Sequence, residues 1–167
     1  MTVISRQPVQ LGDGAPTGLA CSPSPPPAST AEVIPIHVRR ILVVDDDPGF
    51  GKFVRKIGQS CGYEVLLTGD AVSFEIEYAR GKFDLIMLDL QMPGTDGVEL
   101  LRLLADRGCT VPILVMSGFD AKVIDTAHRL GAARGLQMSR VLTKPIRATE
   151  LRTILNEVKQ GLDANVS

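Results

Sequence analysis

Four short runs of apolar residues, almost without alternating polar positions, stand out along this chain. They are Ile41–Val44, Leu85–Leu88, Ile113–Met116 and Val141–Thr143. Runs of this kind are typical of strands that are buried on both faces, as in a parallel β-sheet. Each run leads into polar residues, and the ligand site of such a sheet lies beyond the carboxyl ends of its strands. The pattern therefore predicts an α/β fold with a polar site at one edge of the sheet.

Helical patterns separate the predicted strands. Asp47 suits the N-cap of a first helix and Pro48 its first turn. Asp96 and Glu99 have the spacing of a capping box before a further apolar helix. The other expected elements are a strand over 64–67 and helices over 71–80, from about 121 and around 151–158. Five βα units with right-handed crossovers predict a flavodoxin-like, doubly wound five-stranded parallel sheet, in the order 2-1-3-4-5, with helices on both faces.

Composition divides the chain into three parts. The 167 residues suit one domain plus a tail, with 44% apolar residues and a net charge of −1. Residues 1–37 hold seven of the eleven prolines, so we expect a disordered Pro-rich tail there. We expect a folded domain over 38–161 and a short C-terminal tail over 162–167.

Charge and hydropathy exclude several classes of function. No cluster of Lys and Arg forms a basic stripe, which argues against nucleic-acid binding. No apolar stretch reaches the length of a membrane span, and the N-terminus lacks the pattern of a secretory signal. The three cysteines are too widely spaced for a zinc site or a disulfide framework. We therefore expect a cytoplasmic protein without membrane contact.

The polar residues that follow the strands form one candidate site. Asp45, Asp46 and Asp89 would place three carboxylates close together, where they repel one another and titrate as a coupled group. A divalent cation resolves this repulsion, and hard oxygen ligands suit Mg²⁺. Lys144 adds a positive charge and Ser117 a hydroxyl. Such a set can stabilise a transferring phosphoryl group, and Asp89, alone at the end of the central strand, is the candidate nucleophile.

Two simpler interpretations apply to some of these residues. Asp47 is most simply an N-cap, and a single Asp after a strand is usually a turn or cap residue. The joint placement at four strand ends makes that explanation insufficient for the whole set. Gly49–Lys52 resembles a phosphate-binding loop, but Asp46 and Phe53 stand where that motif needs a glycine and a Ser or Thr.

Four segments resemble the receiver domain of bacterial two-component response regulators, and most closely the stand-alone receivers of the chemotaxis type. Val43–Pro48 resembles the acidic-pair strand end of that family, and Asp84–Gly97 its phosphoacceptor segment. Val115–Gly118 resembles its Ser/Thr strand end, and Leu142–Ile146 its lysine-proline signature. Order and spacing agree over about residues 39 to 161.

The resemblance implies a role for each acid. Asp89 would accept a phosphoryl group from a phosphohistidine on a sensor histidine kinase or a histidine phosphotransfer protein. Asp46, Asp89 and the backbone carbonyl of Gln91 would bind Mg²⁺ directly, and Asp45 would act largely through water.

The resemblance also implies how the signal leaves the site. Lys144 would pair with Asp89 and then with the phosphoryl group, and Ser117 would swing in to hydrogen-bond it. The added charge would switch the face formed by the fourth helix, the fifth strand and the fifth helix, which a downstream protein would read. Dimer formation on phosphorylation is left open. The domain would support its own phosphorylation and dephosphorylation without being an enzyme in the ordinary sense.

Two departures from the family pattern and two alternatives remain. Val141 stands where the family often has an aromatic switch residue, and residues 131–136 lengthen the segment before Lys144 as in receivers attached to cyclic-di-GMP phosphodiesterase domains. One alternative is a phosphatase of the haloacid dehalogenase type, but its second acid is replaced here by Gln91. The other alternative is a pseudo-receiver that binds partners without being phosphorylated.

Overall fold

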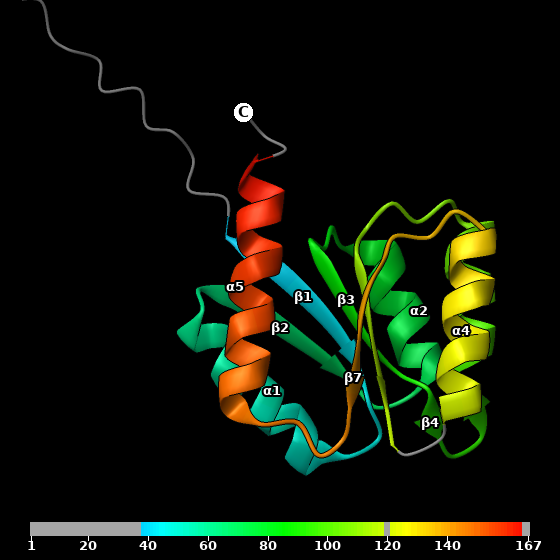
Figure 1. Cartoon of the computed structure of the whole chain (residues 1–167), viewed down its shortest axis with the longest axis horizontal. Helices are drawn as coiled ribbons and strands as arrows, with labels where there is room; N and C mark the ends of the chain where they lie inside the picture. The colour runs from blue at the N-terminus through cyan, green and yellow to red at the C-terminus, as the bar shows by residue number, and fades with distance from the viewer. Residues whose placement is uncertain (1–37, 119–120, 165–167) are drawn as a thin grey trace, which may run out of the picture. The chain divides into compact units, whose positions relative to one another are not determined.

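The structure is a computed structural model that describes residues 38–118 and 121–164. Its centre is a parallel five-stranded sheet in the order β2-β1-β3-β6-β7 (Figure 1). Counted along the chain without the small hairpin described below, this is the predicted order 2-1-3-4-5, and the flavodoxin-like fold is confirmed. The strands are β1 (Arg39–Val44), β2 (Tyr63–Thr68), β3 (Leu85–Asp89), β6 (Ile113–Ser117) and β7 (Met138–Thr143).

Five helices connect and cover these strands. They are α1 (Pro48–Ser60), α2 (Ala71–Arg80), α3 (Gly97–Asp106), α4 (Ala121–Ala133) and α5 (Ala148–Ala164). Helix α5 runs three residues past the expected end of the folded part at residue 161. The expected tail over residues 1–37 lies outside the described residues, as do residues 165–167.

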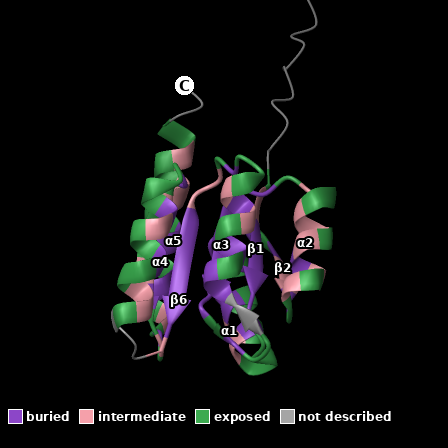
Figure 2. Cartoon of the chain, turned by 90° about the vertical axis from the view of Figure 1, so that its right-hand side faces the viewer, coloured by how far each residue is buried: buried purple, intermediate pink, exposed green. Residues whose placement is uncertain are grey.

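Both faces of the sheet are covered, which explains the lack of alternation in the sequence. Consecutive strand residues point to opposite faces. Ile41 and Val43 pack in one apolar cluster with residues of α1 and α5, whereas Leu42 and Val44 pack in a second cluster with residues of α2, α3 and α4. Figure 2 shows the buried positions on the strands and on the helix faces turned toward them. Every residue of β3 and β6 is buried.

Helix α1 begins as its sequence predicts. The Asp47 side chain accepts a hydrogen bond of 2.8 Å from the Gly49 amide, and Pro48 is the first helical residue. Residues 49–52 therefore form the first turns of a helix rather than a loop that could wrap a phosphate chain.

A short hairpin follows β3 and leads into α3. It pairs β4 (Gln91–Met92) with β5 (Thr95–Asp96), and α3 begins at Gly97, directly after the predicted cap residue Asp96. The side chain of Asp96 lies outside the described part, so the capping box stays a prediction. A Cβ atom at Gly97 would lie 2.6 Å from the carbonyl oxygen of Asp89. Glycine thus allows α3 to approach the end of β3 closely.

The lengthened segment over residues 131–136 forms the end of α4 and its closing turn, in which Gly135 has a φ of 77°.

The described residues also bear on the cysteines and on membrane contact. Of the described cysteines, Cys61 and Cys109 are free and buried. Within residues 38–118 and 121–164, none of the helices has both the length and the apolar character required to cross a lipid bilayer.

Candidate functional site

The sheet brings the predicted site residues to one edge. Asp45 directly follows β1, Asp89 ends β3, Ser117 ends β6, and Lys144 directly follows β7. Because β1, β3, β6 and β7 are neighbouring parallel strands, their carboxyl ends lie side by side. The site therefore brings together residues that are as far apart in the sequence as positions 45 and 144.

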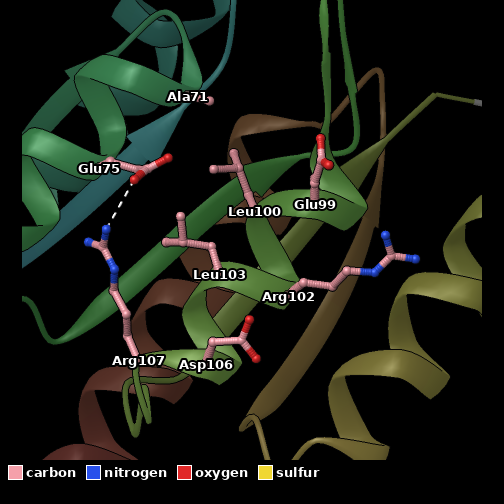
Figure 3. A pocket seen from close by; sticks show the side chains of 8 residues that line it. All are labelled: Ala71, Glu75, Glu99, Leu100, Arg102, Leu103, Asp106 and Arg107. Carbon is pink, nitrogen blue, oxygen red and sulfur yellow. Dashed lines mark hydrogen bonds and ion pairs between the residues drawn. The ribbon is translucent and has the colours of Figure 1, made fainter.

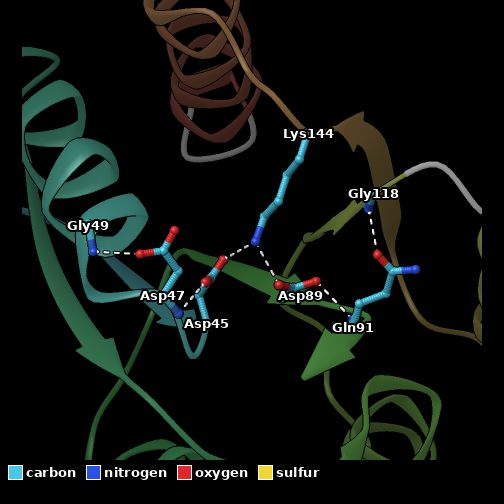
Figure 4. Close-up of polar contacts among 7 residues, drawn as sticks. All are labelled: Asp45, Asp47, Gly49, Asp89, Gln91, Gly118 and Lys144. Atoms are coloured by element: carbon cyan, nitrogen blue, oxygen red, sulfur yellow. Dashed lines mark hydrogen bonds and ion pairs between the residues drawn. The ribbon is translucent and has the colours of Figure 1, made fainter. Parts of the chain in front are cut away.

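Lys144 joins two of the acids. Its Nζ atom lies 2.6 Å from Oδ2 of Asp45 and 2.6 Å from Oδ2 of Asp89 (Figure 4). The peptide bond between Lys144 and Pro145 is cis. Burial by itself lowers the pKa of Lys144, but the hydrogen bonds to the two carboxylates outweigh it, so the pKa lies above its ordinary value of 10.5. The lysine is therefore held charged between the acids.

Backbone amides hold the remaining oxygens of the same two acids. The amide of Asp47 donates to Oδ1 of Asp45, and the amide of Gln91 donates to Oδ1 of Asp89, both at 2.9 Å. Asp45 is 6% exposed and Asp89 is 3% exposed. Burial raises the pKa of Asp45, and the hydrogen bond from Lys144 offsets only part of that rise.

The third acid completes a group that fits a hard cation. One carboxylate oxygen from each of Asp45, Asp46 and Asp89 lies within 4.8 Å of the others, and Asp46 faces solvent. Three carboxylates against the single ammonium of Lys144 leave two uncompensated negative charges. An all-oxygen donor set with this excess charge and one open side suits Mg²⁺, which keeps several of its waters. The residues present therefore fit the ion that the sequence predicted.

Ser117 contributes a buried hydroxyl beside this group. The residue is fully buried, and its Oγ atom has no hydrogen-bond partner among the described residues. A buried hydroxyl without a partner is costly, which favours a role for it with a group that binds later. The backbone amide of Lys144 donates to the carbonyl of Ser117 at 2.7 Å and so ties the ends of β6 and β7 together.

Gln91 makes a contact that the sequence did not predict. Its Oε1 atom accepts a hydrogen bond of 3.0 Å from the amide of Gly118. A Cβ atom at Gly118 would lie 2.5 Å from that oxygen, so the contact depends on glycine. The predicted role of the Gln91 carbonyl as a metal ligand stays a prediction.

The phenyl ring of Phe50 was also missed as part of the site. The ammonium of Lys144 lies 4.4 Å from the centre of this ring. Phe50 lies on α1 and packs partly against the core there. The sequence offered one signal for this contact, namely the position of Phe50 about one helical turn after the acids that follow β1.

A hollow larger than the one beside the site lies elsewhere on the described surface. It has a volume of about 630 Å³ and lies between α2 and α3, where Arg107 forms an ion pair of 3.0 Å with Glu75 (Figure 3). None of its lining residues belongs to the acid group. A smaller hollow of about 240 Å³ is lined by Asp45, Asp46 and Lys52, among others, and is the one that adjoins the site.

Comparison with known proteins agrees with this geometry. Residues 41–156 match the family model of the response regulator receiver domain. Two-component response regulator ORR26 of Oryza sativa subsp. japonica is 36% identical over 125 residues, which is 71% of this chain and 20% of that protein. Transcriptional regulatory protein FixJ of Bradyrhizobium diazoefficiens is 30% identical over 135 residues, 76% of this chain and 66% of FixJ. The chain thus spans from 20% to 66% of the length of these two relatives.

Solved structures give the same result. A response regulator from Colwellia psychrerythraea has a TM-score of 0.64 at 26% identity, with 74% of this chain and 98% of that chain covered. The receiver domain of NtrX from Brucella abortus has a TM-score of 0.63 at 26% identity, with 72% and 98% covered. Both superpose on the folded part of the chain.

Proposed function

Because the chain belongs to the family of response regulator receiver domains, we propose that it is the phosphoacceptor of a phosphorelay, with Asp89 as the acceptor residue. The observation that carries the proposal is the pair of 2.6 Å contacts from Lys144 to Asp45 and Asp89. They place a cation on the candidate nucleophile within a group of three acids. The family is a signalling module, so we expect a phosphorylated product rather than turnover of a substrate.

The chemistry follows from the positions of the side chains. A carboxylate oxygen of Asp89 attacks the phosphorus of a phosphohistidine, and the bond from phosphorus to nitrogen breaks. The electron pair stays on the imidazole of the donor, a sensor histidine kinase or a histidine phosphotransfer protein. Lys144 would offset negative charge on the transferred group, and the hydroxyl of Ser117, which has no hydrogen-bond partner among the described residues, would donate a hydrogen bond to it. Position and charge are the main contributions of a protein to this reaction.

Asp45, Asp46 and Asp89 would hold Mg²⁺, together with the backbone carbonyl of Gln91. When bound, the ion would neutralise charge on the phosphoryl oxygens. Asp89 is buried and Asp46 is exposed, so the acid group opens to solvent on the side of Asp46. Water can reach the acyl phosphate from that side and hydrolyse it, which resets the domain.

The product would act through the face formed by α4, β7 and α5. Ser117 ends β6, the strand that precedes α4, and Lys144 directly follows β7. A new charge at Asp89 would therefore act on the ends of these elements. An ion pair of 2.8 Å between Arg140 and Glu157 already links β7 to α5 on this face. A downstream protein or a second copy of the chain would read the change. A cytoplasmic location of the domain is part of this proposal.

Phosphorylation by a small donor tests the proposal. The full chain is incubated with acetyl phosphate and Mg²⁺, and its intact mass is measured before and after. We expect the wild type to gain the mass of one phosphoryl group and Asp89→Asn to gain none. Asp47→Asn is the matched control, because it also removes an acid near β1 but keeps a side chain that can cap α1.

The other outcomes separate the remaining hypotheses. A wild type that gains no mass, or an Asp89→Asn variant that gains as much as the wild type, contradicts the proposal. A wild type without an adduct and without Mg²⁺ binding indicates a pseudo-receiver. Steady release of phosphate from small phosphomonoesters indicates a phosphatase, although Gln91 cannot protonate a leaving group.

A further inference from the structure

The ammonium of Lys144 touches a third group besides the two acids, the ring of Phe50. The distance from Nζ to the ring centre is 4.4 Å, within the range of a cation–π contact. Phe50 lies in the first turn of α1, in the segment 49–52 that is not a phosphate loop. The side chain of Lys144 is 23% exposed, so the contact is partly shielded from water.

We propose that Phe50 is a positioning residue for Lys144, which keeps the ammonium over the acid group throughout the phosphorylation cycle. The inference rests on the proposed function of Asp89. In this proposal Phe50 acts through Lys144 alone, the residue whose ammonium its ring contacts.

The reason lies in what happens to the other two contacts of Lys144. A cation at the acid group shares the oxygens of Asp45 and Asp89, and phosphorylation replaces the charge of the Asp89 carboxylate with that of the phosphoryl group, to which Lys144 must then turn. Both carboxylate contacts therefore weaken during the reaction. The ring carries no exchangeable proton, binds no hard cation and keeps its place on the helix, so its attraction for the ammonium persists.

The ring itself is fixed by its surroundings. Phe50 packs partly against the apolar cluster under α1, and its ring lies 5.8 Å from that of Phe53 at an angle of 41°. Tilted aromatic pairs at this separation attract each other. A fixed ring lowers the freedom of a lysine side chain that would otherwise lose much rotamer entropy on being ordered.

Nuclear magnetic resonance tests the placement without metal or phosphoryl donor. A ring face shifts the resonances of nearby protons upfield, so we expect the Hε protons of Lys144 to be shifted upfield in the wild type. Phe50→Leu and Phe50→Met remove the ring but keep apolar volume, and we expect both to lose this shift. Phe50→Tyr keeps the ring and should retain the shift. Phe53→Leu removes the neighbouring ring from the same helix and is the matched control.

The rate of phosphorylation by acetyl phosphate with Mg²⁺ tests the consequence. Loss of a cation–π contact corresponds to about a 2- to 30-fold change in the ratio of molecules with Lys144 in place to molecules with it displaced. We expect a decrease of more than about 2-fold, and at most of that size, in the second-order rate constant of Phe50→Leu and Phe50→Met. We expect Phe50→Tyr and Phe53→Leu to stay within about 2-fold of the wild type, below the smallest effect assigned to the contact.

Two results would overturn the inference. One is a Lys144 resonance that does not respond to removal of the Phe50 ring. The other is a rate for the ring-less variants equal to that of Phe53→Leu. A wild type that cannot be phosphorylated contradicts the proposed function instead, and the resonance comparison then still decides whether Phe50 holds the lysine.

Discussion

Replacing Lys144 with Met tests the charge balance of the site. Met has a side chain of similar length without a charge. Asp45 and Asp89 are 6% and 3% exposed, and both would lose the ammonium that lies 2.6 Å away. The variant therefore leaves two neighbouring carboxylates buried and uncompensated while the aliphatic packing is kept.

The expected cost follows from that burial. Removing one partner of a buried ion pair costs about 3–5 kcal/mol, because the other charge stays in a poorly solvated place. The side chain of Lys144 is 23% exposed, so water already screens part of the interaction. We therefore expect the free energy of unfolding to fall by about 2–4 kcal/mol.

Urea unfolding followed by circular dichroism at pH 7, without divalent cations, measures this loss. The midpoint should move to lower urea while the slope stays the same, because the surface exposed on unfolding hardly changes. Lys56→Met is the control, since Lys56 is exposed on α1 and should change the free energy of unfolding by less than about 0.5 kcal/mol.

Titration with Mg²⁺ completes the test. An ion that binds the folded state stabilises it, and Lys144→Met removes the cation that competes for the same oxygens. We expect Mg²⁺ to raise the midpoint of the variant more than that of the wild type. The reasoning is refuted if Lys144→Met is as stable as the wild type in the absence of cations, or if Mg²⁺ stabilises both equally.

Three further predictions concern the surroundings of the site. Asp47→Ala removes the N-cap of α1 and should lower the free energy of unfolding by about 1 kcal/mol in urea denaturation. Asp47→Asn should lower it much less, because asparagine can also cap the helix. Gly118→Ala should displace the Gln91 side chain and lower the free energy of unfolding by about 0.5–1.5 kcal/mol. In a Gln91→Ala background the same substitution should lower it much less, because the contact with Gln91 is already lost. Because the pKa of Lys144 is raised in the folded state, its contribution to stability is complete below its ordinary value of 10.5 and is lost as the pH rises through the folded pKa. The difference in free energy of unfolding between the wild type and Lys144→Met should therefore shrink when urea midpoints are measured at increasingly alkaline pH. A difference that stays constant up to pH 12 would contradict this.

The fold could be predicted where strands are buried on both faces and less well at the edges of the sheet. β3 and β6 are fully buried, and their apolar runs mark them almost to the residue. β7 is an edge strand with three exposed positions, so the sequence revealed only its end at residues 141–143, whereas the strand begins at Met138. The hairpin of β4 and β5 escaped prediction because strands of two residues have no periodic pattern.

The site could be predicted as a set of residues, but its contacts could be predicted only in part. Strand ends converge by topology, so four polar residues at those ends must come together whatever their side chains do. The partners of each side chain depend on rotamers and on neighbours from distant segments. The resemblance predicted the pairing of Lys144 with Asp89, but neither the second contact of Lys144, to Asp45, nor the bond between Gln91 and Gly118 has a signal in local sequence.

The absence of an aromatic residue at position 141 limits how the signal can leave the site. Val141 is half-buried, pairs with Val115 in the sheet and packs partly against the cluster under α4. A valine has a single preferred rotamer in many backbones and no ring to rotate, so it offers little change of shape. The groups that can change partners are instead Ser117, whose buried hydroxyl has none in the described part of the chain, and the bond from Gly118 to Gln91. Under the proposed function, a phosphoryl group on Asp89 would supply an acceptor for the Ser117 hydroxyl. Movement of Ser117 toward it would displace the next residue, Gly118, and would thereby act on the contact of Gly118 with Gln91.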